Sequence, residues 1–418
     1  MSPVIWYVHP YAGGPGIGRY CRPFELGKAW QRAGARPLVI TASFHHLLDE
    51  PGAHPAHVDV EGVPYAFLSV SSYRTNGLGR VVNMAIFTAQ IWRQAARLAQ
   101  RYGRPDLVIG SSPHPYAFLG THAVARRFGA RSVFEVRDLW PLSLVELAGV
   151  SPAHPMVRVT AWLERYAYRH ADTVVSLLPC SRDYMTEHGL DPARWRYIQN
   201  GVESPVLSSR ESTQPCVLTA RRWRDEGRTT VVYAGAMGPP NHVHSLVDAI
   251  DVLRQRGDRK VAAVIVGRGD ESVAIARQVA ELGLGNRVAL FEQIPKREIP
   301  ALLAESDIGY ISLRPEPLFR FGVSPNKLFD YMMAGLPVLF AIQAGNDPVS
   351  DGRCGYSVSP GDKVAIADAL EKLASLPADA RREMGERGRT YVREHHGYER
   401  LAADYLQTIG MPGRVVSR

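Results

Sequence analysis

The chain has 418 residues, of which 45% are hydrophobic and 22% are charged. This length exceeds one ordinary hydrophobic core and predicts two domains of about 200 residues each. No run of about 18 apolar residues could cross a membrane, and the N-terminus "MSPVIWYVHPYAGG" does not resemble a signal peptide. The four cysteines show no paired spacing, which argues against a disulfide framework and a zinc site and indicates a reducing, cytoplasmic compartment.

The formal net charge of +8 is unevenly distributed. Residues 1–200 carry 21 Lys/Arg and 14 Asp/Glu, whereas residues 201–418 carry 28 and 27. A basic first half favours an anionic partner, which could be nucleic acid, a phosphorylated lipid or a membrane surface. The alternative is that the uneven charge is only a chance distribution of basic residues in an arginine-rich protein. No basic run interleaved with aromatic residues indicates a nucleic-acid groove.

Short apolar segments alternate with helical segments in the first half. The predicted strands cover residues 4–10, 37–43, 66–70, 106–112, 131–138 and 173–178, and the clearest helices cover residues 20–34 and 78–102. This alternation predicts a parallel sheet with helices on both faces.

The pattern stops near Asn200 and restarts after residues 203–228, which are polar and then basic and resemble a linker. A strand followed by a glycine turn is predicted at 230–238 and again at 261–271. Further strands are predicted at 288–294, 308–313 and 337–342, with helices at 244–257, 298–306 and 379–408. We therefore predict an α/β protein with two doubly wound, Rossmann-like domains that face each other across a cleft. The predicted domains are residues 1–200 and 201–390, and residues 391–418 are expected to form a C-terminal helix that crosses back to the first domain.

A glycine-rich loop, "YAGGPGIGR", follows the first strand. Its glycines lack the G-x-G-x-x-G spacing of a dinucleotide fingerprint. Four glycines in six residues exceed what a tight turn needs, and glycine lets the backbone approach a phosphate or sugar. We expect Gly14 and Gly16 to contact a donor molecule, with a simple turn as the alternative.

The segment "SPNKLFDYMMAG" predicts a helix start that binds an anion. Ser324 is a good N-cap and Pro325 then occupies the first helical position. The amides of Asn326, Lys327 and Leu328 would point out of the first turn, where the helix dipole also favours an anion. Asp330 lies about one helical turn, roughly 5 Å, from Lys327 and could accept hydrogen bonds from a ribose diol. The alternative is a capped helix with a Lys327–Asp330 ion pair.

Other strand ends carry polar residues suited to a phosphorylated ligand. "GAMGPPN" places Gly238 and Asn241 after a strand, "VGRGDE" places Arg268 after the next, and Arg314 ends a third. Arginines at strand ends suit phosphate oxygens, although ion pairing with neighbouring carboxylates is the alternative. Arg137 and Asp138, after the strand in "EVRDLWP", could face the cleft, with buried ion pairing as the alternative.

The helix predicted at 78–102 has a broad apolar face and arginines at 80, 93 and 97. It could lie on anionic lipid or meet a lipid-linked acceptor, or it could simply pack on its own sheet. The sequence shows no metal-binding histidine pattern and no arrangement typical of a nucleophile.

These residues together resemble the GT-B glycosyltransferases of the large family 4 retaining class. The resemblance covers nearly the whole chain and is strongest in "SPNKLFDYMMAGLPVL", "VRDLWPLSLVELAG", "YIQNGV", "GAMG" and "VGRGDE". It is closest to the WbuB-like branch, which adds amino sugars in bacterial O-antigen and capsule synthesis. The resemblance implies a nucleotide-sugar donor held mostly by the C-terminal domain, and we expect a UDP-sugar. It implies an acceptor held mostly by the N-terminal domain, which in this family is often a polyprenyl-diphosphate-linked sugar at the inner membrane face. It also implies retention at the anomeric carbon and no required metal or other cofactor.

The resemblance also assigns individual residues. Asp330 matches the second acidic position of the family's E-x7-E motif, which usually holds the ribose hydroxyls, while the first acidic position is Gly322 here. Arg137-Asp138 stands where many members have His-Asp, whose histidine often contacts the sugar's C6 hydroxyl, so a 6-deoxy sugar is expected. The stretch "GPPNHVHS" lacks the family's usual basic pair, which leaves Lys327, Arg268 and Arg314 to neutralise the diphosphate. The backbone near Gln293 and Ile294 matches the uracil-binding turn.

The sequence therefore predicts a retaining glycosyltransferase that moves an N-acetylated or 6-deoxy amino sugar from a UDP-sugar to a lipid-linked saccharide. We expect catalytic roles for Lys327, Arg268, Arg137 and Asp138, and acceptor contacts at Arg74, Asn76, Arg80 and His114. One alternative is a sugar-nucleotide epimerase of the same fold. Another, from a different class, is a basic nucleic-acid-binding protein.

Overall fold

The computed structural model describes residues 2–73, 77–203, 212–408 and 410. The chain forms two compact units. The N-terminal unit comprises the residues up to Gly201, Phe321–Ser324 and the residues from Tyr398 onward, and the C-terminal unit comprises Val202–Arg320 and Pro325–Gly397.

The N-terminal unit is built on an eight-stranded sheet in the order β3-β4-β2-β1-β5-β6-β7-β8, in which only the β3–β4 pair is antiparallel. Its strands are β1 (Val4–Val8), β2 (Arg36–Ala42), β3 (His57–Val60), β4 (Val63–Leu68), β5 (Leu107–Ser111), β6 (Arg131–Val136), β7 (Thr173–Ser176) and β8 (Trp195–Tyr197). The strand β1 is buried along its whole length, because both faces of the sheet are covered.

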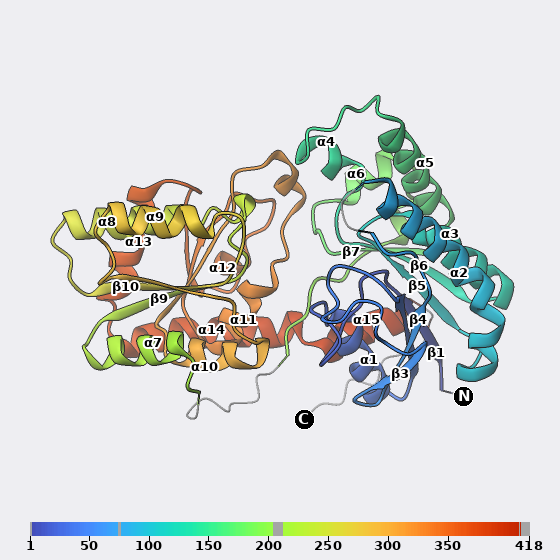
Figure 1. Ribbon diagram of the computed structural model, residues 1–418, viewed down its shortest axis with the longest axis horizontal. Coiled ribbons are helices and arrows are strands. Elements are labelled where there is room, and N and C mark those ends of the chain that lie inside the picture. Colours follow the sequence, from blue (N-terminus) through green and yellow to red (C-terminus); the bar gives the residue numbers. More distant parts are fainter. Residues whose placement is uncertain (1, 74–76, 204–211, 409, 411–418) are drawn as a thin grey trace. The chain divides into compact units, whose positions relative to one another are not determined.

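Helices cover the two faces of this sheet according to the alternation of side chains along β1. Val4, Trp6 and Val8 pack under α2 and α3, whereas Ile5 and Tyr7 pack under α1 and α15. The α2–α3–α5 layer and the α1–α15 pair are seen on opposite sides of the sheet in Figure 1. The helices are α1 (Arg22–Arg32), α2 (Leu78–Tyr102), α3 (Tyr116–Phe128), α4 (Leu142–Glu146), α5 (Pro155–His170), α6 (Arg182–Glu187), the 3-10 helix η1 (Pro192–Arg194) and α15 (Tyr398–Gln407).

A buried polar network fastens α15 to the N-terminal unit. The Arg22 guanidinium lies 3.1 Å from the Glu135 carboxylate, and both side chains are buried. The same carboxylate accepts hydrogen bonds from the hydroxyls of Tyr405 on α15, Tyr7 on β1 and Ser111 on β5. Because so many donors face it, the pKa of Glu135 is lowered although burial alone would raise it. The C-terminal helix is therefore held by a charge as well as by apolar contacts.

The C-terminal unit has a six-stranded, fully parallel sheet in the order β11-β10-β9-β12-β13-β14. Its strands are β9 (Thr229–Ala234), β10 (Val261–Val266), β11 (Val288–Phe291), β12 (Ile308–Ser312), β13 (Val338–Ala341) and β14 (Gly355–Ser357). Its helices are α7 (Pro215–Asp225), α8 (His244–Gln255), α9 (Ser272–Glu281), α10 (Ile299–Ala304), α11 (Asn326–Ala334), α12 (Pro348–Asp351), α13 (Lys363–Ser375) and α14 (Ala378–His396), with 3-10 helices η3 (Pro239–Asn241), η4 (Lys296–Glu298) and η5 (Pro317–Phe321). In Figure 1, α8, α9 and α13 lie on one side of this sheet and α7, α10, α11 and α14 on the other.

Some predicted boundaries were wrong. The stretch 203–228 was predicted as a linker, but it contains α7, whose Cys216, Val217 and Ala220 are buried. The single helix predicted at 379–408 is two helices, because Gly397 has an extended backbone and separates α14 from α15. The C-terminal unit ends at Gly397, and α15 belongs to the N-terminal unit.

Each sheet reverses its strand order at one point. In the C-terminal unit the reversal lies between β9 and β12, and in the N-terminal unit it lies between β1 and β5. Open parallel sheets bind ligands outside the carboxyl ends of their strands at such points. A ligand-binding site is therefore expected among the residues that follow β1 and β5 or those that follow β9 and β12.

Candidate functional site

Lys327 lies at the reversal point of the C-terminal sheet. It is the second residue of α11, and its ammonium group donates hydrogen bonds to Asn241 Oδ1 at 2.7 Å and to Tyr233 Oη at 2.8 Å. The ammonium also lies 4.5 Å from the centre of the Tyr233 ring. Asn241 is held in turn by the Ser312 hydroxyl at the end of β12, which donates to its carbonyl at 2.7 Å. The lysine is thus fixed by groups at or just after the carboxyl ends of β9 and β12.

The environment of Lys327 leaves its charge uncompensated. Burial lowers its pKa to about 7. Among the residues that the structure describes, no carboxylate forms an ion pair with this ammonium, and the Lys327–Asp330 pair considered from the sequence is not formed. The half-buried ammonium group of Lys327, which is hydrogen-bonded to two neutral oxygens, can therefore bind an anion.

Gly235 makes room for this lysine. A Cβ atom at position 235 would lie 3.0 Å from both Cε and Nζ of Lys327 and 3.4 Å from the Tyr233 hydroxyl. Contacts of 3.0 Å are tighter than nine in ten of those that real Cβ atoms make, so a side chain here would require the lysine to shift by a few tenths of an ångström. Because Gly235, the first glycine of "GAMG", has no side chain, Lys327 can occupy its observed position.

The start of α11 differs from the sequence prediction. The helix begins at Asn326 with Pro325 as its N-cap, and Ser324 does not cap it. Instead the Ser324 hydroxyl accepts from the Asn200 backbone amide at 3.1 Å, and the Asn200 side chain donates to the Ser324 carbonyl at 2.7 Å. The Leu328 amide donates to the Pro325 carbonyl, so it is not available to an anion as predicted. The remaining first-turn amides are those of Asn326 and Lys327, and Asn326 is exposed.

Asp330 is a half-buried carboxylate one turn further along α11. Burial raises its pKa to about 6, and the charge of Lys296 only partly offsets this effect. Within the described residues no hydrogen-bond donor is found for this carboxylate. It is therefore an acceptor without a donor, as a site for hydroxyl groups requires.

The loop after β9 and the loop after β10 pack against each other. The amide of Met237 donates to the Arg268 carbonyl at 2.9 Å, and Cβ atoms at Gly267 or Gly269 would meet the backbone of the opposite loop at 1.8 Å and 2.3 Å. The absence of side chains at Gly267 and Gly269 therefore allows the two loops to pack closely. By contrast, a Cβ at Gly238 would meet nothing closer than 3.8 Å, so that position has free space beside its backbone.

The arginines predicted at the strand ends differ in their surroundings. The Arg268 side chain is exposed, and no ion pair involves it among the described residues. Arg314 donates to Glu271 at 3.1 Å, which is the ion pairing considered as its alternative role. Gln293 is exposed and Ile294 is buried in the loop after β11.

In the N-terminal unit the glycine-rich loop folds on itself. The Gly14 amide donates to the Gly18 carbonyl at 3.1 Å, and Tyr65 donates to the Gly13 carbonyl at 2.7 Å. Gly14 is buried, whereas Gly16 is exposed, has a φ of +68° and would meet nothing within 4 Å if it carried a Cβ. Of the two predicted donor contacts, only Gly16 presents an accessible backbone.

Aromatic and imidazole side chains gather after β1, β2 and β5 of the same unit. The Tyr11 hydroxyl accepts from Arg80 at 3.1 and 3.2 Å, and the Tyr11 ring lies 6.1 Å from the ring of His114. His114 is buried, and neither of its ring nitrogens has a hydrogen-bond partner within the described part of the chain. Burial lowers the pKa of His114 to about 3, and the same cause lowers that of His45 to about 3, so both are neutral at pH 7.

Arg137 lies against the same group of rings. Its guanidinium stacks 4.0 Å from the centre of the Tyr20 ring and lies 3.4 Å from His9 Nε2. No residue that the structure describes forms a hydrogen bond with its Nε. Asp138, the next residue, is exposed. The buried ion pair considered for these two is not formed among the described residues. Arg74 and Asn76, predicted as acceptor contacts, lie outside the described residues.

Sequence reasoning missed several residues of these clusters. Tyr233, Tyr11, His9 and His45 were not singled out, because apolar strands and lone histidines carry no motif. Their only signal was position, since each lies at or just after the end of a predicted strand.

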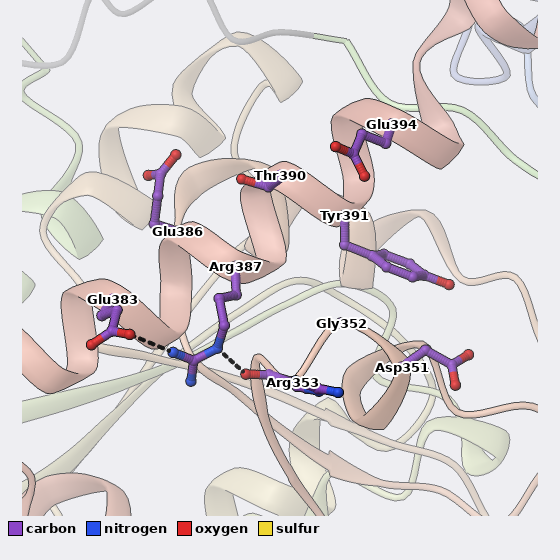
Figure 2. A pocket seen from close by; sticks show the side chains of 9 residues that line it. All are labelled: Asp351, Gly352, Arg353, Glu383, Glu386, Arg387, Thr390, Tyr391 and Glu394. Carbon is purple, nitrogen blue, oxygen red and sulfur yellow. Dashed lines mark hydrogen bonds and ion pairs between the residues drawn. The ribbon is translucent and has the colours of Figure 1, made fainter.

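Other features of the described residues do not add to the site. No group of three or more His, Cys, Asp or Glu residues in this part of the chain could hold a metal ion, and no helix in it is long and apolar enough to cross a membrane. A surface hollow of about 370 Å³ lies between α12 and α14, where Arg387 donates to Glu383 and to the Arg353 carbonyl (Figure 2). None of the predicted site residues lines this hollow.

Comparison with protein families assigns both parts of the chain. Residues 16–201 match the model described as "Glycosyl transferase 4-like domain", and residues 228–375 match the model described as "Glycosyl transferases group 1". The second match contains the segments after β9, β10 and β12 and the whole of α11.

Relatives and solved structures agree with this assignment. The chain is 26% identical to the MMP alpha-(1->4)-mannosyltransferase of Mycolicibacterium hassiacum over 63% of its length and 60% of that protein. It is 25% identical to the alpha-D-kanosaminyltransferase of Streptomyces kanamyceticus, over 54% of this chain and 57% of that one. The alignments thus span less than two thirds of these relatives. The crystal structure of Anabaena Alr3699/HepE in complex with UDP superposes with a TM-score of 0.66 at 17% identity, covering 98% of this chain and 99% of that one.

Proposed function

Since the chain combines a glycosyl transferase 4-like domain with a glycosyl transferases group 1 domain in a GT-B fold, we propose that it is a retaining glycosyltransferase that uses a UDP-sugar. The single observation that carries this proposal is the uncompensated cation of Lys327 at the reversal point of the C-terminal sheet. The complex of Anabaena Alr3699/HepE with UDP supports uridine diphosphate as the donor nucleotide.

The donor is proposed to bind along the first turn of α11. Its diphosphate contacts the Lys327 ammonium and the free amide of Asn326, with the exposed Arg268 as a further cation. The Asp330 carboxylate accepts from the ribose hydroxyls, and the loop at Gln293 and Ile294 receives the uracil. The free space beside Gly238 allows the diphosphate to approach the backbone there.

The chemical step then depends on charge stabilisation. The bond between the sugar's anomeric carbon and the β-phosphate oxygen breaks, and its electron pair stays on the diphosphate. The acceptor oxygen bonds to the anomeric carbon on the same face, and its proton passes to the departing phosphate oxygen. Lys327 stabilises the charge that grows on this leaving group, which is the interaction that lowers the barrier. No metal is required in this scheme, so a chelator should not change the rate.

The finer substrate assignment rests on the resemblance and on the relatives. The kanosaminyltransferase supports an amino-sugar donor, and Arg137 in place of the family's usual histidine supports a 6-deoxy or otherwise modified C6 position. The proposed acceptor is a polyprenyl-diphosphate-linked saccharide of bacterial surface polysaccharide synthesis, bound by the N-terminal unit near Arg80 and His114. The enzyme would then work in the cytoplasm, peripherally on the inner membrane.

A two-part assay tests the proposal. Thermal shift across a panel of nucleotide sugars identifies the donor, because a bound donor raises the unfolding temperature by mass action. UDP release is then measured with and without a lipid-linked saccharide, and the anomeric configuration of the product is determined by NMR. Release that requires the acceptor and an α-product from an α-donor support the transferase. Interconversion of the donor sugar without acceptor would instead identify an epimerase.

A further inference from the structure

Three helices of the N-terminal unit form one strongly basic layer. The helices α2, α3 and α5 lie side by side on the same face of the sheet (Figure 1). Together they carry nine arginines and a single acidic residue, Glu164. The nine are Arg80, Arg93, Arg97, Arg101, Arg126, Arg127, Arg158, Arg165 and Arg169. The remainder of residues 1–200 carries 12 Lys/Arg and 13 Asp/Glu, so this layer contains the whole charge excess of the first half.

The one carboxyl group in the layer does not reach the surface. Glu164 is 1% exposed, accepts from the Tyr168 hydroxyl at 3.0 Å, and has a pKa raised to about 8 by burial. It is therefore mostly protonated at pH 7 and compensates none of the arginines.

The arginines themselves are available to an external partner. Eight of the nine, all except Arg80, are exposed, and none of those eight has a carboxylate within 4 Å among the described residues. Arginines elsewhere in the same unit do form ion pairs, such as Arg131 with Asp172 at 3.9 Å and Arg194 with Asp191 at 3.7 Å. Other exposed arginines of the unit, such as Arg104 and Arg196, also have no ion pair among the described residues, so the layer is distinguished by having no exposed acidic residue on its three helices.

Large apolar side chains stand among these arginines. On α2, Val82 and Trp92 are 50% and 52% exposed, and on α5, Val159 and Trp162 are 51% and 56% exposed. Val82, Ala85, Ala89 and Trp92 follow at intervals of three and four residues and are all exposed, so they form one line along the outer face of α2. The inner face of α2 has its own apolar line of Phe87, Ile91, Ala95 and Leu98, which packs on the sheet. The outer line therefore has no function in the core.

We propose that the outer face of α2, α3 and α5, here called the basic layer, docks the protein on the surface of an anionic lipid bilayer. The arginines meet lipid phosphates, and Trp92 and Trp162 enter the interfacial region, where tryptophan is enriched in membrane proteins. The exposed aliphatic side chains of Val82 and Val159 beside the tryptophans favour a bilayer over nucleic acid, because bases stack on aromatic side chains along a basic groove and gain little from aliphatic ones. The docking inference rests on the proposed function in one respect only: docking would bring the enzyme to a lipid-linked acceptor.

Vesicle binding by the full-length protein tests this directly. Co-sedimentation is measured with vesicles of phosphatidylcholine alone and of phosphatidylcholine mixed with phosphatidylglycerol, at low and raised salt. Arg93→Gln/Arg165→Gln is compared with Arg259→Gln/Arg277→Gln, which removes the same charge from exposed positions of the C-terminal unit. Each arginine at an anionic surface contributes about fivefold in partitioning, so we expect the first pair to lose about 20- to 30-fold and the second pair about none.

A second arm tests insertion of the tryptophans. Trp92→Ala/Trp162→Ala should weaken binding at all salt concentrations, whereas Leu218→Ala, which alters an exposed apolar residue of α7, should not. In the unaltered protein, brominated lipids should quench tryptophan fluorescence, and the double Trp variant should lose most of that quenching.

Several results would overturn the proposal. The first is no binding to anionic vesicles, and the second is an equal loss of vesicle binding in the two double arginine variants. The third is oligonucleotide binding that is stronger than vesicle binding and is lost in Arg93→Gln/Arg165→Gln. The fourth is self-association that Trp92→Ala abolishes, in a protein that does not bind vesicles. Transfer to a short, soluble acceptor is measured in parallel. If that activity is intact while vesicle binding is absent, the docking inference fails alone, and if vesicle binding is intact without any transfer, the proposed function fails alone.

Discussion

The ammonium nitrogen of Lys327 lies 2.7 Å from the side-chain oxygen of Asn241, and this hydrogen bond joins the first turn of α11 to the loop after β9. The two residues are 86 positions apart in the chain. Because Asn241 and Tyr233 supply neutral oxygens and no charge, they orient the lysine without neutralising it. The site is thus fixed in position while its charge stays available for a ligand, which is the property that the following predictions use.

Donor affinity should depend on the protonation of Lys327. Its pKa is about 7 in the free protein, and a bound diphosphate raises it, so UDP binds with uptake of a proton above about pH 7. The sign follows from this uptake: affinity is highest near neutral pH and falls as pH rises, by up to about tenfold per pH unit. Calorimetric titration of UDP in buffers of different ionisation enthalpy measures both the affinity and the proton uptake.

Lys327→Arg is the control for this pH effect, because arginine stays charged over the whole range. The arginine variant should bind UDP with a nearly flat pH profile and without proton uptake. An unaltered protein with flat affinity between about pH 7 and 9 would show that Lys327 does not meet the diphosphate.

Gly235→Ala should impair the donor site while leaving the fold intact. The added Cβ would lie 3.0 Å from Lys327 Nζ and require the lysine to shift by a few tenths of an ångström, which disturbs its hydrogen bonds to Asn241 and Tyr233. We expect UDP affinity to fall about tenfold or more, which corresponds to loss of about 1.4 kcal/mol. Gly285→Ala is the matched control, since a Cβ at that position meets nothing within 4 Å. Equal UDP affinity in the two variants would contradict the role given to Gly235.

Asp330→Asn should make the free protein more stable and the donor complex weaker. The folded-state pKa of about 6 is above the ordinary 3.8, so the native state holds more protons than the unfolded state between these values and stability falls as pH rises through that window. Asparagine cannot ionise and avoids this loss, so we expect a gain of about 1 to 2 kcal/mol above pH 6, after allowance for partial exposure, and none below about pH 4.

The same variant tests the ribose contact. A hydrogen bond to a charged acceptor contributes about 1.5 to 3 kcal/mol, so UDP affinity should fall by about tenfold or more. Urea denaturation at several pH values and UDP titration give the two quantities. A variant that is stabilised but binds UDP as before would leave Asp330 without a role in the donor site.

Two ion pairs made by arginines of α1, one buried and one exposed, should differ in energy. Arg22→Ala leaves the buried Glu135 carboxylate without its cation and should destabilise the protein by about 3 to 5 kcal/mol. Arg32→Ala breaks the pair with Glu399 on α15, whose side chains are more than 60% exposed, and should cost less than about 1 kcal/mol. Urea denaturation followed by circular dichroism compares them, and similar losses would show that the buried network does not stabilise the unit.

The alternation of apolar strands and helices was sufficient to predict two sheets that are parallel apart from the β3–β4 pair, and the GT-B fold is confirmed. Lys327 and Asn241 were each singled out from local patterns, but their contact was not predicted, because the pairing depends on the strand order of the folded sheet. The role given to Ser324 was wrong for a similar reason: its hydroxyl is engaged by Asn200, 124 residues away. The helix α7 was missed because its polar flanks resemble a linker, and only burial of residues such as Cys216 identifies it.

The central claim is that Lys327 stabilises the departing diphosphate, and the rate of transfer tests it most directly. The kcat/KM of sugar transfer is measured for Lys327→Ala and for Lys372→Ala, which removes an exposed lysine that stacks 4.3 Å from the Tyr356 ring and so matches Lys327 in charge and in its contact with a tyrosine. Removal of a group that stabilises transition-state charge lowers the rate by about 100- to 1,000-fold, and we predict this loss for Lys327→Ala and no loss for Lys372→Ala. Transfer by Lys327→Ala at the rate of the Lys372→Ala protein would contradict the account.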